Sequence, residues 1–212
     1  MPALRPAELL AGTTLALDVE QLGNAVLILN EFALAGYPTE VAAAAVANAY
    51  GESQLRAEAS GDDGHSIGLF QLNDCTYLEP TIAKSCGGYG MSVSQRQNPR
   101  TNTHRAIELA RKVWPELHAQ GSTIYTATGA FTQYVEKPTD VQREMGKRAG
   151  FADQLFPAYS RLDRSELPRL SVAALDRVNG FVTYTYPLGW AGVGLTVVGL
   201  GLLYWTASTW SD

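Results

Sequence analysis

The sequence predicts a mostly α-helical domain with a small β-hairpin region, followed by one C-terminal transmembrane helix. Apolar residues recur at helical spacing through most of the first 160 residues, whereas runs with the two-residue period of a strand are scarce. Charge is distributed unevenly along the chain. There are 16 basic and 21 acidic side chains, and only one of them, Asp212, lies after Arg177. The chain therefore divides into an ordinarily charged part and an uncharged tail.

Helical periodicity identifies the elements of the charged part in order. Residues 18–35 form the first predicted helix, and Pro38 then interrupts the chain. Thr39 is expected to cap a second, alanine-rich helix over residues 41–55. Residues 61–68 are a glycine-rich loop, and residues 68–73 (GLFQLN) are the best strand candidate. Later helices are expected over 101–118, where Pro115 kinks or ends the helix, and near 123–134 and 140–160.

The uncharged tail has the length of a membrane span. Residues 187–208 would extend about 33 Å as a helix, enough for a hydrocarbon core of about 30 Å. Tyr186 and Trp205 lie near its two ends, as interfacial aromatic residues do. We expect a domain over residues 1–160, a connector over 161–186 and a transmembrane helix over 187–208. The alternative is a buried hairpin, favoured by the glycines and by the strand-like run VTYTY.

The charges that flank the tail predict an orientation. Four arginines precede it and nothing basic follows it, so the N-terminal side should face the compartment of synthesis. The net charge of −5 argues against nucleic acid as a partner. The His and Cys residues lack any familiar metal-ligand spacing, so neither a metal nor another cofactor is expected. Cys75 and Cys86 are interpreted either as a disulfide or as two free thiols.

Glu52 is the candidate catalytic residue. Ala45, Ala49 and Glu52 share one face of the alanine-rich helix, so the carboxyl group lies on an apolar surface. It also lies near the C-terminal end of the helix, where the dipole disfavours negative charge. Both effects raise the pKa of a carboxyl group, and a protonated acid is what a glycosidase needs to protonate a leaving oxygen. The alternative is a frayed helix end with Glu52 in solvent.

Six segments, in order along the chain, place Glu52 in a wider pattern. Gly51-Glu52-Ser53 is followed by Gly61-Asp62-Asp63-Gly64 and by Gly68-Leu69-Phe70-Gln71. Asn98-Pro99-Arg100-Thr101-Asn102 precedes a long helix, and Phe131-Thr132-Gln133-Tyr134-Val135-Glu136-Lys137-Pro138 comes later, before Arg148-Ala149-Gly150-Phe151-Ala152. Over roughly residues 40–155 this resembles the lysozyme-like superfamily, in particular phage-type muramidases and lytic transglycosylases.

The resemblance implies a lysozyme-like α+β fold, peptidoglycan as the substrate and Glu52 as the catalytic acid. It places Gln71 near sugar hydroxyls and adds Ser53 and Ser66 to the expected binding residues. Phe131 and Tyr134 either line the sugar site or belong to the core. Glu136 is either a second cleft carboxylate or a structural partner of the next helix, and the abundance of ion-paired glutamates favours the structural role.

The second carboxylate decides the reaction. A hydrolase needs a base or nucleophile opposite the acid, and Asp62 is the better candidate, with Asp63 the other. Lytic transglycosylases use the substrate's own 6-hydroxyl and form a 1,6-anhydro product. They usually carry Tyr-Asn-x-Gly where this chain has Ala130-Phe131-Thr132-Gln133, and this departure favours hydrolysis.

These inferences predict a membrane-anchored muramidase that cuts the MurNAc-β-1,4-GlcNAc bond. Residues 187–208 would bind a lipid membrane, beside virion or membrane-protein neighbours. An enzyme facing the cytosol cannot reach a cell wall, so we expect a phage virion membrane, or otherwise the bacterial cell envelope. Two alternatives are a glycan-binding structural virion protein and a membrane-disrupting lysis protein.

Overall fold

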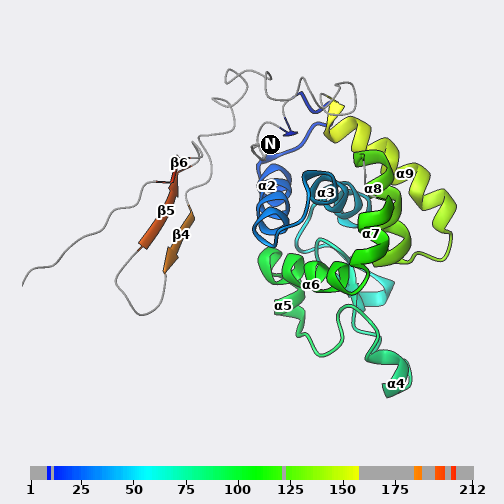
Figure 1. The fold of residues 1–212 in the computed structure, drawn as a ribbon. Helices are drawn as coiled ribbons and strands as arrows, with labels where there is room; N and C mark the ends of the chain where they lie inside the picture. The colour runs from blue at the N-terminus through cyan, green and yellow to red at the C-terminus, as the bar shows by residue number, and fades with distance from the viewer. Residues whose placement is uncertain are drawn as a thin grey trace, which may run out of the picture.

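The computed structural model describes residues 9–10, 12–120 and 123–157, and the backbone of 184–187, 194–198 and 202–203. The predicted predominance of helix with a small β region is confirmed (Figure 1). The helices are α2 (Val19–Leu34), α3 (Thr39–Ser53), α4 (Pro80–Ala83), α5 (Val93–Gln97), α6 (Pro99–Lys112), α7 (Trp114–Gln120), α8 (Ile124–Phe131) and α9 (Val141–Leu155). The strands of the first sheet are β1 (Ser60–Gly61), β2 (Ser66–Ile67) and β3 (Leu72–Asn73).

Helix α3 forms the centre of the domain. It packs against α2, α8 and α9, and every residue from Val41 to Ala49 is buried. The alanines give α3 a thin cross-section, so neighbouring helices approach it from several sides. The core around it contains four fully or almost fully buried aromatic rings, those of Phe32, Phe70, Phe131 and Phe156.

The helix boundaries follow local capping interactions. Asp18 and Gln21 form a reciprocal capping box at the start of α2, and the Asn98 side chain accepts from the Thr101 amide at the start of α6. The predicted cap at Thr39 is wrong, because Thr39 is already helical and Pro38 occupies the cap position. The helix predicted over 101–118 divides at Val113, where α6 ends, and Pro115 lies in the first turn of α7.

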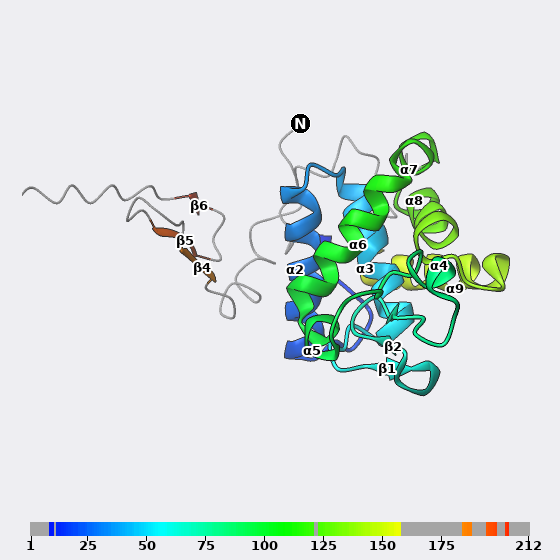
Figure 2. The ribbon, with the colours of Figure 1, turned by 90° about the horizontal axis from the view of Figure 1, so that it is seen from below.

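The small sheet follows directly from α3 and lies at its C-terminal end (Figure 2). The three strands are antiparallel, with Gly61 opposite Ser66 and Ile67 opposite Leu72. Only residues 72–73 of the strand predicted over 68–73 are extended, because residues 68–71 form the turn that joins β2 to β3. Asn102 holds this turn from α6: its Oδ1 accepts from the Phe70 amide, and its Nδ2 donates to the Ile67 carbonyl.

In the described residues of the segment predicted as a transmembrane helix, 187–208, no helix is found. Where the structure describes this tail it has strands instead: β4 (Tyr184–Pro187), β5 (Gly194–Val198) and β6 (Leu202–Leu203), paired in that order as an antiparallel sheet. Among the described residues no helix is both long and apolar enough to cross a membrane. Thr, Val and Tyr favour strands, and the glycines of the tail disfavour helix. The remainder of 187–208, and all of the connector except 184–186, lies outside the described residues.

Candidate active site

Glu52 lies in the last turn of α3, where the helix gives way to the sheet. Gln54 and Leu55 follow it with positive φ values of 53° and 60°, so the chain turns sharply away. The Glu52 side chain is 21% exposed, so it lies at the surface of the core and does not extend freely into solvent. The alternative of a frayed, fully solvated helix end therefore does not describe this residue.

Arg148 of α9 holds the Glu52 carboxylate. Its Nη2 lies 2.6 Å from Glu52 Oε1, and its Nη1 donates to the carbonyl of Asn48 at 3.0 Å. The Arg148 side chain is only 4% exposed. A hydrogen-bonded ion pair of this kind restricts the carboxylate to one orientation.

Gly51 allows Arg148 to reach this position. A Cβ atom at residue 51 would lie 1.9 Å from Arg148 Nη1 and 2.6 Å from Arg148 Cδ. The guanidinium therefore crosses α3 where a side chain is missing. Glycine is needed at position 51 because a side chain there would occupy the space of Arg148, and not because the backbone requires the conformational freedom of glycine.

The pKa of Glu52 is raised above its ordinary value. Burial is the largest cause, because it disfavours the charged form. The charge and hydrogen bond of Arg148 act in the opposite direction, and the negative charges of Glu144 and Asp62 add to the increase. Glu144 lies 3.5 Å from Arg148 Nη2 and also pairs with Lys147 at 2.7 Å.

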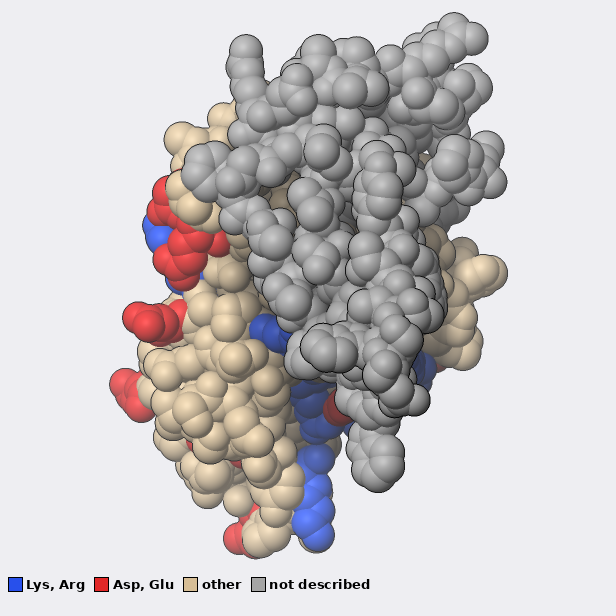
Figure 3. Space-filling view, turned by 90° about the vertical axis from the view of Figure 1, so that its left-hand side faces the viewer, with Lys and Arg blue, Asp and Glu red and all other residues tan. Residues whose placement is uncertain are grey.

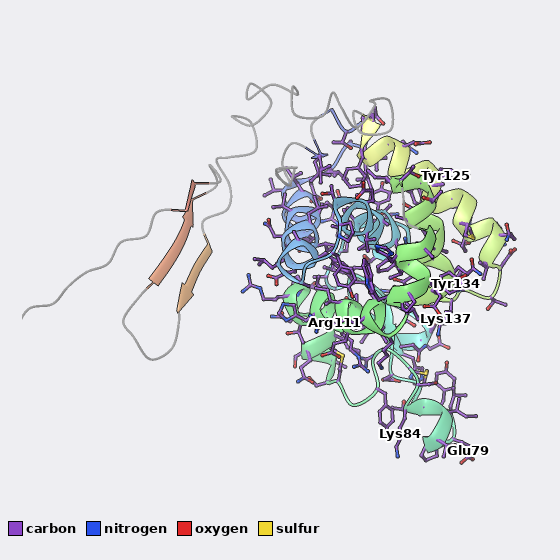
Figure 4. The ribbon with its side chains drawn as sticks, in the orientation of Figure 1. Glu79, Lys84, Arg111, Tyr125, Tyr134 and Lys137 are labelled. Atoms are coloured by element: carbon purple, nitrogen blue, oxygen red, sulfur yellow. A yellow bond between two sulfur atoms is a disulfide. The ribbon has the colours of Figure 1, made fainter. Side chains whose placement is uncertain are left out.

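Glu136 is a second carboxyl group whose pKa depends on the charges of Glu52 and Arg148. It ends a π-helical turn, η2 (Thr132–Glu136), and Lys137 follows it with a positive φ of 54°. Figure 4 shows Tyr134 and Lys137 on the side of the domain opposite α2. The pKa of Glu136 is raised well above its usual range, first by burial and then by the negative charge of Glu52, while Arg148 opposes the increase. Glu136 is therefore affected by the charges of Glu52 and Arg148, and π-helical turns are frequent at functional sites.

Asp62 and Asp63 lie in a tight turn between β1 and β2, and both are exposed with positive φ. Asp62 is fixed by hydrogen bonds from the Ser66 hydroxyl and from Asn73 Nδ2, the latter at 3.3 Å. Its negative charge contributes to the raised pKa of Glu52. Ser66 is buried and holds Asp62, so its hydroxyl is already engaged within the protein.

Ser53 and Gln71 hold the turn between β2 and β3. The Ser53 hydroxyl is buried within 2.9 Å of the carbonyl oxygens of Ala49 and Leu69. The Gln71 amide nitrogen donates to the carbonyls of Ala59 and Gly68, both at 3.0 Å. Ser53 therefore joins the end of α3 to this turn, and Gln71 joins the turn to the backbone just before β1.

The two aromatic residues of the expected sugar site differ in their surroundings. Phe131 is completely buried, with its ring 5.9 Å from that of Phe32 and 6.2 Å from that of Phe70. Of the two interpretations of Phe131, its burial supports a place in the core. Tyr134 is partly buried and packs against the edge of the core.

A disulfide joins Cys75 and Cys86, and it closes the loop that carries α4. Glu79 and Lys84 lie at the far end of this loop (Figure 4). Asp74, just before the loop, accepts from Arg96 Nη2 at 2.9 Å and lies 2.9 Å from His65 Nδ1. Burial would raise the pKa of Asp74, but hydrogen bonds from His65 and Thr76 and the charge of Arg96 lower it to about 2. In the described part of the chain, no three His, Cys, Asp or Glu side chains are grouped so that they could hold a metal ion.

A surface pocket of about 590 Å³ lies elsewhere on the domain and includes none of the predicted site residues. It is lined by Glu20, Arg56, Ala57, Glu58, Ala59, Gln97 and Pro99. Arg56 is already paired with Asp18 and Glu20. The clustering of carboxyl groups, and not this hollow, therefore identifies the candidate site.

The role of Arg148 was missed by sequence reasoning. The residue stands in a recognised segment, but 96 positions separate it from Glu52 and no local spacing connects them. The available signal was the glycine before Glu52, which leaves room for a long side chain from another helix.

The model of the phage tail lysozyme family matches residues 23–159 of the chain. No curated protein and no solved structure matches the chain. The matched segment contains Glu52, the β1–β2 turn, Glu136 and Arg148, and it covers more than half of the sequence. The chain therefore belongs to the phage tail lysozyme family.

Proposed function

We propose that this protein is a muramidase that cuts the MurNAc-β-1,4-GlcNAc bond of peptidoglycan, with Glu52 as the general acid. Membership of the phage tail lysozyme family supports a phage enzyme that degrades peptidoglycan. The observation that carries the residue assignment is the desolvated, fixed position of the Glu52 carboxyl at the end of α3. A general acid must keep a proton near neutral pH, and burial favours the protonated form.

Hydrolysis is the reaction we favour over lytic transglycosylation. Asp62 is the second carboxylate of this proposal, because its charge acts on Glu52 and because Ser66 and Asn73 hold it in place. In that position it would activate water or stabilise the positive charge that develops on the sugar. Asp63 is its neighbour in the same turn and the alternative for this role.

The biological setting we propose is a phage particle in which the enzyme opens the cell wall. The family match supports the phage origin of the activity. A glycan-binding structural protein would not depend on Glu52, and a membrane-disrupting protein would permeabilise lipid vesicles without any glycan.

The test is digestion of purified peptidoglycan by the full chain and by its Glu52→Gln variant. We expect the variant to lose activity by about a hundredfold or more, because general acid catalysis contributes at least that much. Glu108→Gln is the matched control, because Glu108 is an exposed glutamate that pairs with Arg105 on α6. Equal activity of wild type and Glu52→Gln would refute the assignment.

The masses of the products separate the two reactions. Hydrolysis adds one water to each cleaved bond, whereas transglycosylation leaves an anhydro-muramic end that is lighter by one water. Anhydro products would refute hydrolysis while preserving the role of Glu52.

A further inference from the structure

Both ends of the loop that the disulfide closes bind the same residue, Asn73 of β3. The Cys75 amide donates to Asn73 Oδ1 at 2.7 Å, and the Gly88 amide donates to the Asn73 carbonyl at 2.8 Å. Cys75 is one end of the disulfide, and Gly88 lies two residues after the other end, Cys86. The loop therefore holds Asn73 by its side chain and by its backbone.

Asn73 in turn holds the carboxylate of Asp62. Its Nδ2 donates to Asp62 Oδ2 at 3.3 Å and to Ser66 Oγ at 3.1 Å, and the Ser66 hydroxyl also donates to Asp62. Asp62 is exposed, so these hydrogen bonds, and not burial, determine where its carboxylate lies. A continuous chain of hydrogen bonds thus runs from the Cys75 amide through the Asn73 side chain to Asp62.

The disulfide restricts Cys75, the loop residue that contacts the Asn73 side chain. Cys75 has a φ of 52°, a left-handed conformation that is disfavoured for a residue with a Cβ atom. The crosslink excludes conformations in which Cys75 moves away from Cys86. Cys86 is itself tied to α6, because Arg105 Nε donates to the neighbouring Gly87 carbonyl at 2.7 Å. Without the bond, Cys75 can leave its disfavoured conformation and release Asn73 Oδ1.

The rest of the small sheet has support that does not depend on the loop. Arg96 of α5 has a side chain that is only 3% exposed, and it donates to the Leu72 carbonyl at 3.1 Å and to Asp74 Oδ2 at 2.9 Å. These contacts hold β3 whether or not the disulfide is present. Breaking the bond is therefore expected to act on Asn73 and on the Asp62 carboxylate that it orients.

We propose that the Cys75–Cys86 disulfide controls the activity of this enzyme by positioning Asp62 through Asn73. The inference rests on the proposed function, in which Asp62 is the second carboxylate. Asn73 is a positioning residue, since it acts through Asp62. Because Ser66 still donates to Asp62 after reduction, the carboxylate is loosened and the loss of activity is partial.

The switch is a thiol–disulfide exchange with a dithiol reductant. One thiolate of the reductant attacks Cys86 Sγ, which belongs to a partly exposed residue, and buried Cys75 leaves as a thiolate. The second thiolate of the reductant then displaces Cys86 from the mixed disulfide. The two protons of the dithiol end on the two cysteines, and the reductant becomes a cyclic disulfide. The less active dithiol form prevails in a reducing compartment and the active disulfide form in an oxidising one.

The first experiment measures turnover of solubilised peptidoglycan by the full chain before reduction with dithiothreitol, after it, and after reoxidation. We expect reduction to lower kcat about fivefold or more, to leave KM within about twofold and to be reversible, because displacement of a catalytic group weakens the transition state more than binding. The matched control, Cys75→Ser with Cys86→Ser, should show the lower activity and not respond to dithiothreitol. An unchanged kcat of the reduced wild type, or a response of the double variant, would overturn the proposal.

The second experiment separates control through Asn73 from a general loosening of the loop. We expect oxidised Asn73→Ala to lose about as much kcat as the wild type loses on reduction. Reduction of Asn73→Ala should then cost less than about twofold more, because both changes break the same chain of hydrogen bonds. A loop with a structural role alone would give two losses that multiply, and that result would contradict the proposal.

The third experiment does not depend on activity. In an isotope-labelled chain, reduction should shift the NMR signals of the Asn73 side-chain amide and the Asp62 carboxyl carbon. The Asn102 side-chain amide, which holds the β2–β3 turn from α6, should not shift. Unchanged Asn73 and Asp62 signals, or an equal change at Asn102, would refute the coupling. A fully active Glu52→Gln would instead refute the proposed function, because the NMR signals report the coupling without substrate.

Discussion

At the scale of single residues, the position of Glu52 depends on how Arg148 crosses α3. The guanidinium is buried, contacts the Asn48 carbonyl and reaches Glu52 over the bare backbone of Gly51. A substitution at Gly51 or Arg148 should therefore displace the Glu52 carboxylate, although Glu52 itself is unchanged. Catalytic groups held by packing from a second helix are sensitive to small displacements.

Gly51→Ala should displace Arg148 and disturb Glu52 while leaving both residues in the chain. We expect a loss of activity of about tenfold or more, and destabilisation of about 1–3 kcal/mol from overpacking. Turnover of peptidoglycan and thermal unfolding measure the two effects. Gly146→Ala is the matched control, because a Cβ there meets no atom within 4 Å and alanine favours helix. Full activity of Gly51→Ala would contradict the role given to this contact.

Asp74 should make the free energy of unfolding depend on pH in the acidic range. Its pKa is lowered to about 2 in the folded protein, so its stabilising contribution is present above the unfolded value near 3.8 and is lost as pH falls through about 2. The contribution is on the order of 1 kcal/mol after allowance for solvent screening.

Asp74→Asn should therefore be less stable than wild type at neutral pH, and the difference should narrow between pH 4 and pH 2. Chemical unfolding measured across this range tests the sign. A difference that stays constant with pH would show that the carboxylate charge is not the cause.

At the scale of elements, the loop between β3 and α5 depends on the disulfide more than on packing. The bond joins residues 11 positions apart, and Ala83 is the buried residue of α4. Tyr77, Leu78, Ile82 and Tyr89 are exposed along this loop, so the core contributes little to holding it.

Replacing Cys75 and Cys86 together by serine should destabilise this loop locally. A crosslink of this length contributes about 2–3 kcal/mol in the chain-entropy account. Limited proteolysis should cut the variant within residues 75–91 while the helices remain intact by circular dichroism. Reductant should sensitise the wild type in the same way and leave the variant unchanged. Global unfolding of the variant would contradict a local role.

At the scale of the whole molecule, the domain extends beyond the segment that matches the family. Leu9 and Leu10 are buried, the Thr14 amide donates to the Gln154 carbonyl at 2.9 Å, and Asp18 caps α2. These residues precede the matched range of 23–159, yet they close the core against α9. Seen from the α2 side, the described surface carries acidic atoms along one edge and basic atoms in a narrow line (Figure 3).

Truncation should show which part of the chain forms the enzyme. We expect residues 1–160 to retain peptidoglycan cleavage within about twofold of the full chain. Residues 23–160 should be less stable by about 4 kcal/mol or more, because two buried leucines and a helix cap are lost. Thermal unfolding and turnover of the two truncated chains test this, and equal stability of both would contradict a structural role for the first 22 residues.

Much of the architecture could be predicted because it depends on local patterns. Apolar periodicity identified α2, α3, α6, α8 and α9, although α6 begins at Pro99, two residues before the predicted start, where Asn98 caps it. The tail was predicted to be a transmembrane helix from its length and its lack of charge, but these two features do not distinguish a helix from strands. Its glycines disfavour a helix, and its β-branched residues favour strands. The short helices α4 and α5 lie in a loop held by a disulfide and carry little periodic signal.

The sequence by itself determined the helical class, the position of Glu52 at the end of a buried helix and the glycine-rich turn that carries Asp62. The tertiary structure decided which side chains surround Glu52. It brought Arg148 to Glu52 across 96 residues and buried Phe131 in the core. The physical reason is range: periodicity and capping act over a few residues, whereas burial and charge balance depend on every helix that packs against α3.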